Sequence, residues 1–566
     1  MKKYLQPLFG ALAAALLIAG CATPPAPPLT INLVSLNDFH GNLEAHKYSY
    51  RTVAQKESVT IQAGGVETVA GALAQWRKED PELLLVAAGD LVGASPALSS
   101  MWADEPTLTA LSMLGMNVSS VGNHEFDQGR VELLRQQNGG CVSPRPDKAC
   151  KFDGPFGGAS YRYLAANVLD TASGKPVLPA YRIEQRQGVK IAFIGAVLHD
   201  TASMVLASGI AGLTFTDEAE AINRAAAAAR AEGATVFIVL IHEGGNTDEP
   251  FDQPGCEHLK GPIVAIARKL DPAIKLIVSG HTHKGFMCKV DDRTITQAEM
   301  GGHVLTRIRL DVDPASHALR KVEANNVVMV PGAYPPVPAM TAFMARVRAK
   351  SAEALARPIA RVAVRSVVRK HTDTGENALG DVIADGVLSA TKPLGAQIGF
   401  MNTGGMRQDF EVGADLVAIY GEAQVVLPFG NTIVLMDMTG AELRAVLDQQ
   451  WLRPHPDMEA SMLQISQGFS YQWDERKPKG ERVVPGSLML NGVPIDEART
   501  YRVAVNNFLA EGGDSFPAFG SARNKVDTQI RDNDAFIAWL VKLDKAGTPL
   551  ALNTPAGRIT MIKKEK

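Results

Sequence analysis

The chain has 566 residues, and at about 100–200 residues per domain this length predicts two or three domains rather than one. Apolar residues make up 46% of the sequence and charged residues 21%, which is ordinary for a folded soluble protein. The net charge of −3 argues against general affinity for nucleic acid, because such binding needs a basic footprint. A phosphorylated small substrate is compatible with this charge, since bound metal ions can supply positive charge locally.

The first residues have the features of a targeting segment rather than of a fold. Lys2 and Lys3 form a basic start, and the apolar stretch from Leu8 to Ile18 is too short to span a bilayer comfortably. The stretch is followed by Cys21 and a run rich in proline. This pattern resembles a bacterial lipoprotein signal.

The resemblance implies a signal peptide over residues 1–20, acylation of Cys21 and a flexible tether over residues 21–29. Ala22, where an aspartate would retain the protein at the inner membrane, implies sorting to the outer membrane. We therefore expect a lipid-anchored protein of the cell envelope that faces the periplasm. Membrane contact is expected through the lipid only, because no other stretch is long and apolar enough to span a bilayer. The alternative is a plain secretory signal with an incidental cysteine.

Beyond Cys21 the chain has four cysteines, an even number, as disulfides in an exported protein require. Cys141 and Cys150 bracket a polar loop, and Cys256 and Cys288 flank a predicted strand, so we predict the pairs 141–150 and 256–288. The alternative is four free thiols. A cysteine-based metal site is disfavoured because no Cys-x-x-Cys spacing occurs.

From residue 31 to about residue 330, short apolar runs alternate with helical stretches. The predicted strands are Ile31–Leu36, Leu83–Ala88, Val118–Val121, Lys190–Val197, Thr235–Ile241 and Ile274–Ser279. The predicted helices include Gly64–Lys78, Thr107–Leu114 and Thr216–Glu232, the last with Thr216 as its expected N-cap. Strands that alternate with helices predict a layered α/β domain.

A helix predicted over Pro338–Arg357 and broken by Pro358 separates this region from the rest of the chain. We therefore place a first domain at residues 30–337, a connector helix at 338–358 and a second, smaller α/β domain at 359–566. The elements predicted in the second domain are the helices Ala378–Ser389 and Thr439–Gln450 and the strands Val425–Leu427, Thr432–Met438 and Thr500–Val505.

Polar side chains follow five of the predicted strands at the point where each strand ends. Seven of them are candidate metal ligands: Asp38, His40, Asp90, Asn123, His242, His281 and His283. The carboxyl ends of strands in an α/β sheet lie along one edge, where ligand sites form. Seven donors are too many for one ion and suit two, and oxygen and imidazole donors without thiolate favour Mn²⁺, Zn²⁺, Co²⁺, Fe or Mg²⁺. Two such ions can clamp the attacking and leaving oxygens of a phosphoryl displacement.

These motifs resemble a known family. Asp38-x-His40, Gly89-Asp90, Gly122-Asn123-His124-Glu125, His242 and Gly280-His281-Thr282-His283 are similar to the signature of calcineurin-like metallophosphoesterases. The longer forms Asn37–Gly41 and Gly122–Asp127 are similar to the 5′-nucleotidase branch, which includes periplasmic UDP-sugar hydrolases. The resemblance covers nearly everything after residue 30. It implies a four-layer αββα catalytic domain followed by a smaller α/β substrate-binding domain.

The resemblance also implies roles for these residues. One metal ion takes Asp38, His40 and His283, the other takes Asn123, His242 and His281, and Asp90 bridges them. His124 and Asp127 form a catalytic dyad, in which the carboxylate orients the imidazole that stabilises the phosphoryl oxygens. The alternative is that His124 is another ligand or the neighbour of a helix N-cap. Some relatives carry Gln in place of His283, which leaves the identity of the metal open.

In the second domain the resemblance implies contacts with a nucleotide. The expected contacts are Asn402, Gly405, Arg407, Phe429, Asn431, Phe508 and Asp514. Arg407 is expected near phosphate or ribose, Asn402 near the base, and Asp514 on the ribose hydroxyls. Phe429 and Phe508 are expected to sandwich the base, the alternative being that both rings are core residues.

The function implied is two-metal hydrolysis of nucleoside 5′-monophosphates by a monomer, with other nucleotides and UDP-sugars as further candidate substrates. A 2′,3′-cyclic-nucleotide 2′-phosphodiesterase/3′-nucleotidase is an alternative, although that subfamily tends to carry Tyr where this chain has Phe at the base clamp. A more distant alternative is the thiosulfohydrolase of sulfur oxidation. A non-catalytic nucleotide-binding lipoprotein is disfavoured by the complete ligand set together with His124 and Asp127.

Overall fold

The computed structural model describes residues 27–55, 57–452 and 460–563. The predicted signal peptide, Cys21 and most of the predicted tether lie outside the described residues, so the expectations for them stay predictions. Within these three ranges no helix has the length and apolar character needed to cross a bilayer.

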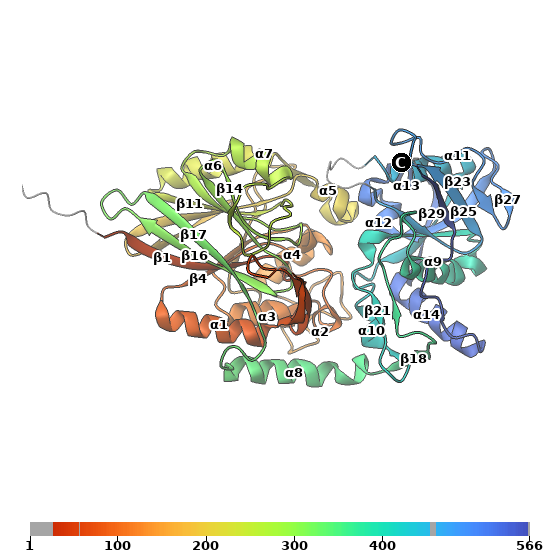
Figure 1. The fold of residues 1–566 in the computed structure, drawn as a ribbon, viewed down its shortest axis with the longest axis horizontal. Helices are drawn as coiled ribbons and strands as arrows, with labels where there is room; N and C mark the ends of the chain where they lie inside the picture. The colour runs from red at the N-terminus through yellow and green to blue at the C-terminus, as the bar shows by residue number, and fades with distance from the viewer. Residues whose placement is uncertain (1–26, 56, 453–459, 564–566) are drawn as a thin grey trace, which may run out of the picture.

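The first domain is built on two sheets that pack face to face (Figure 1). The six-stranded sheet has the order β17-β16-β1-β4-β5-β6 and contains parallel β1 (Leu29–Leu36), β4 (Leu84–Ala88) and β5 (Val118–Ser120). The seven-stranded sheet has the order β12-β14-β15-β13-β11-β9-β8. Its central parallel strands are β9 (Val189–Val197), β11 (Val236–His242) and β13 (Ile274–Val278). The other strands are β6 (Arg162–Leu164), β8 (Tyr181–Arg186), β12 (Pro254–Cys256), β14 (Gly285–Val290), β15 (Arg293–Ala298), β16 (Val304–Val312) and β17 (Leu319–Val328).

Helices cover the outer face of each sheet. The side chains between the sheets, such as Leu33, Val86, Phe193 and Ile238, are apolar and fully buried, and each contributes about 1.5–3 kcal/mol to stability. The helices over the six-stranded sheet are α1 (Val66–Glu79), α3 (Glu105–Met113) and α4 (Gly129–Asn138), and those over the other sheet are α6 (Glu218–Ala231) and α7 (Pro262–Lys269). The layers are therefore αββα, which confirms the predicted fold class.

The predicted strands and helices of this domain agree with the structure to within two residues at each end. The expected N-cap of α6 is wrong by one position. The carboxylate of Asp217 accepts the backbone N–H of Glu220 at 2.9 Å, whereas the Thr216 hydroxyl bonds to the Asn167 carbonyl. The acidic residue caps the helix, because its carboxylate reaches the free N–H groups of the first turn.

Helix α8 (Pro338–Leu355) connects the two domains; it runs along one side of the first and its end reaches the second (Figure 1). Its buried face, which includes Met340, Met344 and Val347, packs into the core of the first domain. Its end packs on α10 (Tyr420–Gln424) of the second domain. The chain then enters β18 (Pro358–Arg361), whose first residue is the proline expected to break the helix.

The second domain contains a five-stranded sheet with the order β24-β20-β28-β23-β29 and a four-stranded sheet with the order β27-β26-β25-β30. The strands of the first are β24 (Leu463–Ile465), β20 (Ile398–Asn402), β28 (Thr500–Asn506), β23 (Thr432–Thr439) and β29 (Arg523–Arg531). Those of the second are β27 (Val493–Pro494), β26 (Met489–Leu490), β25 (Phe469–Asp474) and β30 (Ile559–Ile562). The main helices are α9 (Ala378–Thr391), α11 (Gly440–Gln449) and α14 (Asp532–Lys545).

One predicted element of this domain is wrong. Residues 425–427 form a turn after α10 and not a strand. Val426 and Leu427 are buried in the core cluster beneath α9 and α14, so their apolar character reflects packing of a turn.

Both predicted disulfides are present. Cys141–Cys150 closes the loop after α4, and Cys256–Cys288 joins β12 to β14, where the strand register places the two residues opposite each other. The second disulfide thereby ties the segment before α7 to the strand that follows His283.

Candidate active site

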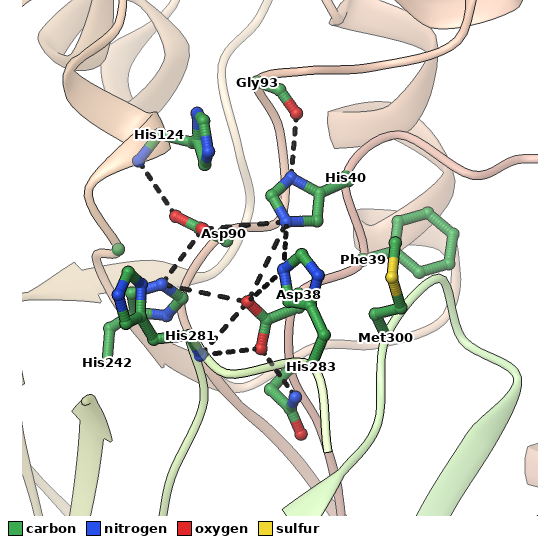
Figure 2. Close-up of polar contacts among 12 residues, drawn as sticks. Asp38, Phe39, His40, Asp90, Gly93, His124, His242, His281, His283 and Met300 are labelled. Carbon is green, nitrogen blue, oxygen red and sulfur yellow. Dashed lines mark hydrogen bonds and ion pairs between the residues drawn. The ribbon is translucent and has the colours of Figure 1, made fainter. Parts of the chain in front are cut away.

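Loops that follow β1, β4, β5 and β13, together with the last residue of β11, carry all seven predicted metal ligands to one edge of the stacked sheets. Asp38, His40, Asp90, Asn123 and His242 are buried, whereas His281 and His283 are half-buried. In Figure 2 the ligands that it labels, Asp38, His40, Asp90, His242, His281 and His283, lie around a common centre.

Asp38, His40 and His283 form the first cluster. The Nε2 atom of His283 lies 3.2 Å from Oδ1 of Asp38 and 3.1 Å from Nε2 of His40. The Nδ1 atom of His40 is 2.9 Å from the carbonyl of Gly93. Because a carbonyl can only accept, Nδ1 carries the proton and Nε2 presents its lone pair to the cluster.

Asp90 links this cluster to His242. Its Oδ2 atom lies 2.9 Å from Nε2 of His242 and 3.6 Å from Nε2 of His40. His242 donates its Nδ1 proton to the carbonyl of Ala88 at 2.7 Å, so Nε2 is the ring nitrogen directed at the Asp90 carboxylate. A buried imidazole nitrogen that converges with carboxylate oxygens in this way fits a bound cation.

The electrostatics of the cluster point the same way. Burial lowers the pKa of His242, but the carboxylates of Asp90 and Asp38 outweigh it and raise the pKa to about 10. The same two carboxylates therefore create a strongly negative field at the place where the imidazole lone pairs converge. A divalent ion would neutralise the negative charge and accept the imidazole lone pairs.

His281 and Asn123 complete the set. The Nδ1 atom of His281 lies 3.2 Å from Oδ1 of Asn123, and the rings of His281 and His242 form a T-shaped pair with centroids 5.3 Å apart. Two triads of donor atoms, Asp38-His40-His283 and Asp38-Asp90-His242, each fit within 4.8 Å. The structure thus brings together all seven residues, with Asp90 in contact with one histidine from each implied set.

The backbone around these ligands is held in an unusual conformation. Left-handed φ angles occur at Asp38 (49°), His40 (47°), Asp90 (51°), His281 (75°) and His283 (54°). Each such residue costs on the order of 1–3 kcal/mol and persists only where its surroundings enforce it. Gly122 belongs to this packing, because a Cβ there would overlap the Asp90 carboxylate. Five of the seven ligands therefore lie on strained backbone.

His124 and Asp127 form a hydrogen-bonded pair beside the metal ligands. They lie at the two ends of a short 3₁₀ turn, η1 (His124–Phe126), in which side chains three residues apart are eclipsed. The Nδ1 atom of His124 is 2.8 Å from Oδ2 of Asp127. Burial lowers the pKa of His124, but the charges of Asp127 and Asp90 raise it above its ordinary value. The arrangement can present a protonated imidazole to an anionic substrate.

Glu125 belongs to the site but was not among the predicted site residues. Its carboxylate accepts the backbone N–H groups of Asp90 at 2.9 Å, of Leu91 at 2.8 Å and of Gly122. Burial and the nearby Asp90 raise its pKa to about 7. Glu125 therefore fixes the loop that carries Asp90 against the loop that carries His124. Its place inside the Gly122–Asp127 motif is the signal that could have identified it.

A cavity of about 340 Å³ lies between the two domains. On the side of the first domain it is lined by Asn123, His124, Asp127 and His281. All seven predicted substrate residues line the other side: Asn402, Gly405, Arg407, Phe429, Asn431, Phe508 and Asp514. Phe429 and Phe508 are therefore cavity residues and not core residues.

Hydrogen bonds fix several of these side chains. Asn402 donates to Oδ2 of Asp514 at 2.7 Å and accepts from Asn506 at 2.8 Å. The ring of Phe508, on α12 (Asn507–Ala510), lies so close to Gly513 that a Cβ there would overlap it. This wall of the cavity is consequently ordered by contacts within the second domain.

Arg407 brings positive charge to the cavity. The charges of Asp90, Asp127 and Asp38 act on its guanidinium, although burial and the neighbouring Arg369 lower its pKa overall. Arg369, which the sequence could not assign, donates to the Met406 carbonyl at 3.0 Å. The Arg407 guanidinium of the second domain thus faces carboxylates of the first, an arrangement suited to an anion between them.

Two further features of the cavity were not predicted, because no sequence motif marks them. The segment after α5 (Thr201–Met204), with Val205 and Leu206, gives the cavity an apolar wall from the first domain. Next to it, Glu511 of the second domain accepts the backbone N–H of Ser208 at 3.0 Å and is 3.1 Å from the Ser208 hydroxyl. These contacts join the domains on one side of the cavity.

Comparison with known proteins agrees with this geometry. Residues 31–285 match the calcineurin-like phosphoesterase family, and residues 355–521 match the family described as 5′-nucleotidase, C-terminal domain. The chain is 30% identical over 546 residues to endonuclease YhcR of Bacillus subtilis, which covers 95% of this chain and 41% of that protein. It is 26% identical over 594 residues to a 5′-nucleotidase of Vibrio cholerae, with 96% of each chain covered.

Among solved structures, a 5′-nucleotidase precursor from Thermus thermophilus is similar. Its sequence identity is 26% and its TM-score is 0.74, over 95% of this chain and 100% of that chain. The similarity therefore extends over both domains. The similarity to endonuclease YhcR is partial on the other side, because this chain spans less than half the length of that protein.

Proposed function

We propose that this chain, which belongs to the 5′-nucleotidase family, releases phosphate from nucleoside 5′-monophosphates with the help of two divalent metal ions. The observation that carries the proposal is the cavity that joins two of the metal ligands, Asn123 and His281, and the His124–Asp127 pair to seven predicted substrate residues of the second domain. Other nucleotides and UDP-sugars are further candidate substrates, because the cavity requires only a phosphate at one end and a nucleoside at the other.

The seven ligands would hold the ions, which we take to be Mn²⁺, Zn²⁺, Co²⁺, Fe or Mg²⁺ from the donor types. When bound, the ions supply Lewis-acid stabilisation of the charge on the transferring phosphoryl group. Asp38 and Asp90 provide the negative charge that retains them, and Glu125 keeps the Asp90 loop in place.

His124 acts on the phosphoryl group directly. Because Asp127 binds Nδ1, the ring nitrogen left for the substrate is Nε2, which donates its proton to a phosphoryl oxygen as charge develops. One well-placed donor of this kind contributes about 2.7–4 kcal/mol to the transition state. Arg407 adds positive charge from the opposite side of the cavity.

The second domain holds the nucleoside. Phe508 offers a ring for stacking, which contributes about 1–3 kcal/mol per base. Asp514, oriented by Asn402, offers carboxylate oxygens for the ribose hydroxyls. Asn402 and Asn431 offer amide groups to the polar edge of the base.

The test is a phosphate-release screen of the metal-loaded protein. The substrates are adenosine 5′-monophosphate (AMP) and other 5′-monophosphates, 3′-monophosphates, 2′,3′-cyclic nucleotides, UDP-glucose and an oligonucleotide. We expect the highest kcat/KM for 5′-monophosphates. Highest activity on cyclic nucleotides would favour the 3′-nucleotidase alternative, and turnover of none would favour a binding protein.

For location we propose a lipid anchor at Cys21, supported by the sequence alone. Cys21→Ser should move the protein from the membrane fraction to the soluble envelope fraction. Mass spectrometry of the mature N-terminus should find the lipid in the wild type. Unchanged membrane attachment together with an unmodified wild-type N-terminus would contradict the anchor.

A further inference from the structure

The loop between α10 and β23 carries Phe429 across the domain boundary onto the catalytic pair. The ring centroids of Phe429 and His124 lie 5.6 Å apart and their planes differ by 15°, so the rings are stacked. The sequence predicts that Phe429 forms one half of a base clamp with Phe508. Among the described residues, however, the ring stacked on Phe429 is that of His124.

The other contacts of His124 leave this face for Phe429 to cover. Asp127 holds one edge of the imidazole through Nδ1, and the ring of His40 meets it in a T-shaped contact with centroids 5.1 Å apart. Gly93 packs behind it, because a Cβ at Gly93 would come within 2.6 Å of the His124 Cβ. Phe429 is the side chain of the second domain whose ring is stacked on the imidazole, among the residues that the structure describes.

Phe429 also separates two spaces. His124, Asp127 and Phe429 line both the 340 Å³ cavity and a second cavity of about 30 Å³ behind the pair. The second cavity is lined by charged groups such as Glu132 and Arg145. The phenyl ring thus lies at the boundary between the two cavities, beside the imidazole. The guanidinium of Arg407, 5.8 Å from the Phe429 centroid, packs on the same ring.

We propose that Phe429 is a positioning residue for His124, holding the plane of the imidazole so that Nε2 stays directed at the phosphoryl group. The inference rests on the proposed phosphoester hydrolysis but concerns the catalytic pair and not the nucleobase. It follows that the second domain supports the chemistry even for a substrate that has no base to bind. Phe429 can hold the imidazole only when the domains are arranged as in this structure.

The test uses the metal-loaded full chain and p-nitrophenyl phosphate, which has no nucleobase. For Phe429→Leu we expect kcat to fall about 2- to 12-fold, the range for loss of one aromatic pair, with KM nearly unchanged. Phe429→Tyr, which keeps the ring, should restore kcat. Phe156→Leu is the matched control: the guanidinium of Arg135 lies 5.4 Å from the Phe156 ring, and no described histidine is stacked on that ring. Its kcat should equal that of the wild type.

A double-mutant cycle separates positioning from a general structural role. In a His124→Ala background, Phe429→Leu should change kcat by less than about 2-fold, because the residue through which it acts is absent. The same loss in both backgrounds would overturn the proposal, as would an unchanged kcat in the single variant.

A crystal structure of the metal-loaded Phe429→Leu variant gives an answer that does not depend on turnover. We expect the His124 ring to leave its wild-type plane or to occupy more than one orientation. An imidazole in the wild-type position would overturn the proposal. Absence of p-nitrophenyl phosphate and nucleotide turnover in the wild type would instead contradict the proposed function, and the crystal structure would still decide the role of Phe429.

Discussion

The two halves of the proposed active site are built in different ways. The metal half comes from loops of one domain, anchored on two packed sheets and held in left-handed conformations at residues such as Asp38 and Asp90. The substrate half belongs to the second domain and meets the first across a cavity, with direct side-chain contacts such as Phe429 on His124. The metal half is therefore organised by its own domain, whereas the substrate half acts only in the right domain arrangement.

The largest effect should come from the centre of the metal half. Asp90→Asn should lose at least one ion and reduce turnover by at least about 10²–10³-fold, because this carboxylate contacts a histidine of each set. Elemental analysis alongside phosphate release measures both quantities. Full metal content with normal turnover would falsify the linking role of Asp90.

Removal of His124 should separate catalysis from metal binding. His124→Ala should keep both ions and lower kcat by about 10²–10³-fold, since the imidazole serves the transition state. His258→Ala is a matched control, because His258 also pairs with a carboxylate but is 79% exposed at the surface. Loss of metal in proportion to the loss of activity would show instead that His124 is a ligand.

The smallest effect should come from the contacts that join the domains. Glu511→Ala removes the two hydrogen bonds to Ser208, and exposed contacts of this kind contribute about 0.2–1 kcal/mol. We expect KM for AMP to rise by about 1.4- to 5-fold with little change in metal content. Glu497→Ala, which breaks an ion pair with Arg444 inside the second domain, is the control. Equal KM values for the two variants would argue against a role for this interdomain contact.

The same contrast explains what the sequence could and could not predict. Each metal ligand follows an apolar run, and the strand character of such runs is set largely by local pattern. The fold class and the convergence of Asp38, Asp90 and His242 at one sheet edge could therefore be predicted. The short run 425–427 was misassigned because three apolar residues have the same pattern in a buried turn as in a strand.

Other features depend on chain segments that meet only in three dimensions. Glu125 binds backbone N–H groups of a loop some 30 residues earlier in the chain, a relation that no spacing encodes. The stacking of Phe429 on His124 depends on how the two domains are arranged. The sequence could identify Phe429 as a loop aromatic of the second domain, but not the ring that it faces.

The central claim is that one substrate bridges the two halves, with its phosphate at the metal ligands and its base at Phe508. The most direct measurement is kcat/KM of Phe508→Ala on AMP and on p-nitrophenyl phosphate in parallel. Loss of base stacking predicts a fall of about 5- to 150-fold with AMP and a much smaller fall with the substrate that has no base. Equal losses on both substrates would mean that the ring supports the fold and not the base, and would contradict the account.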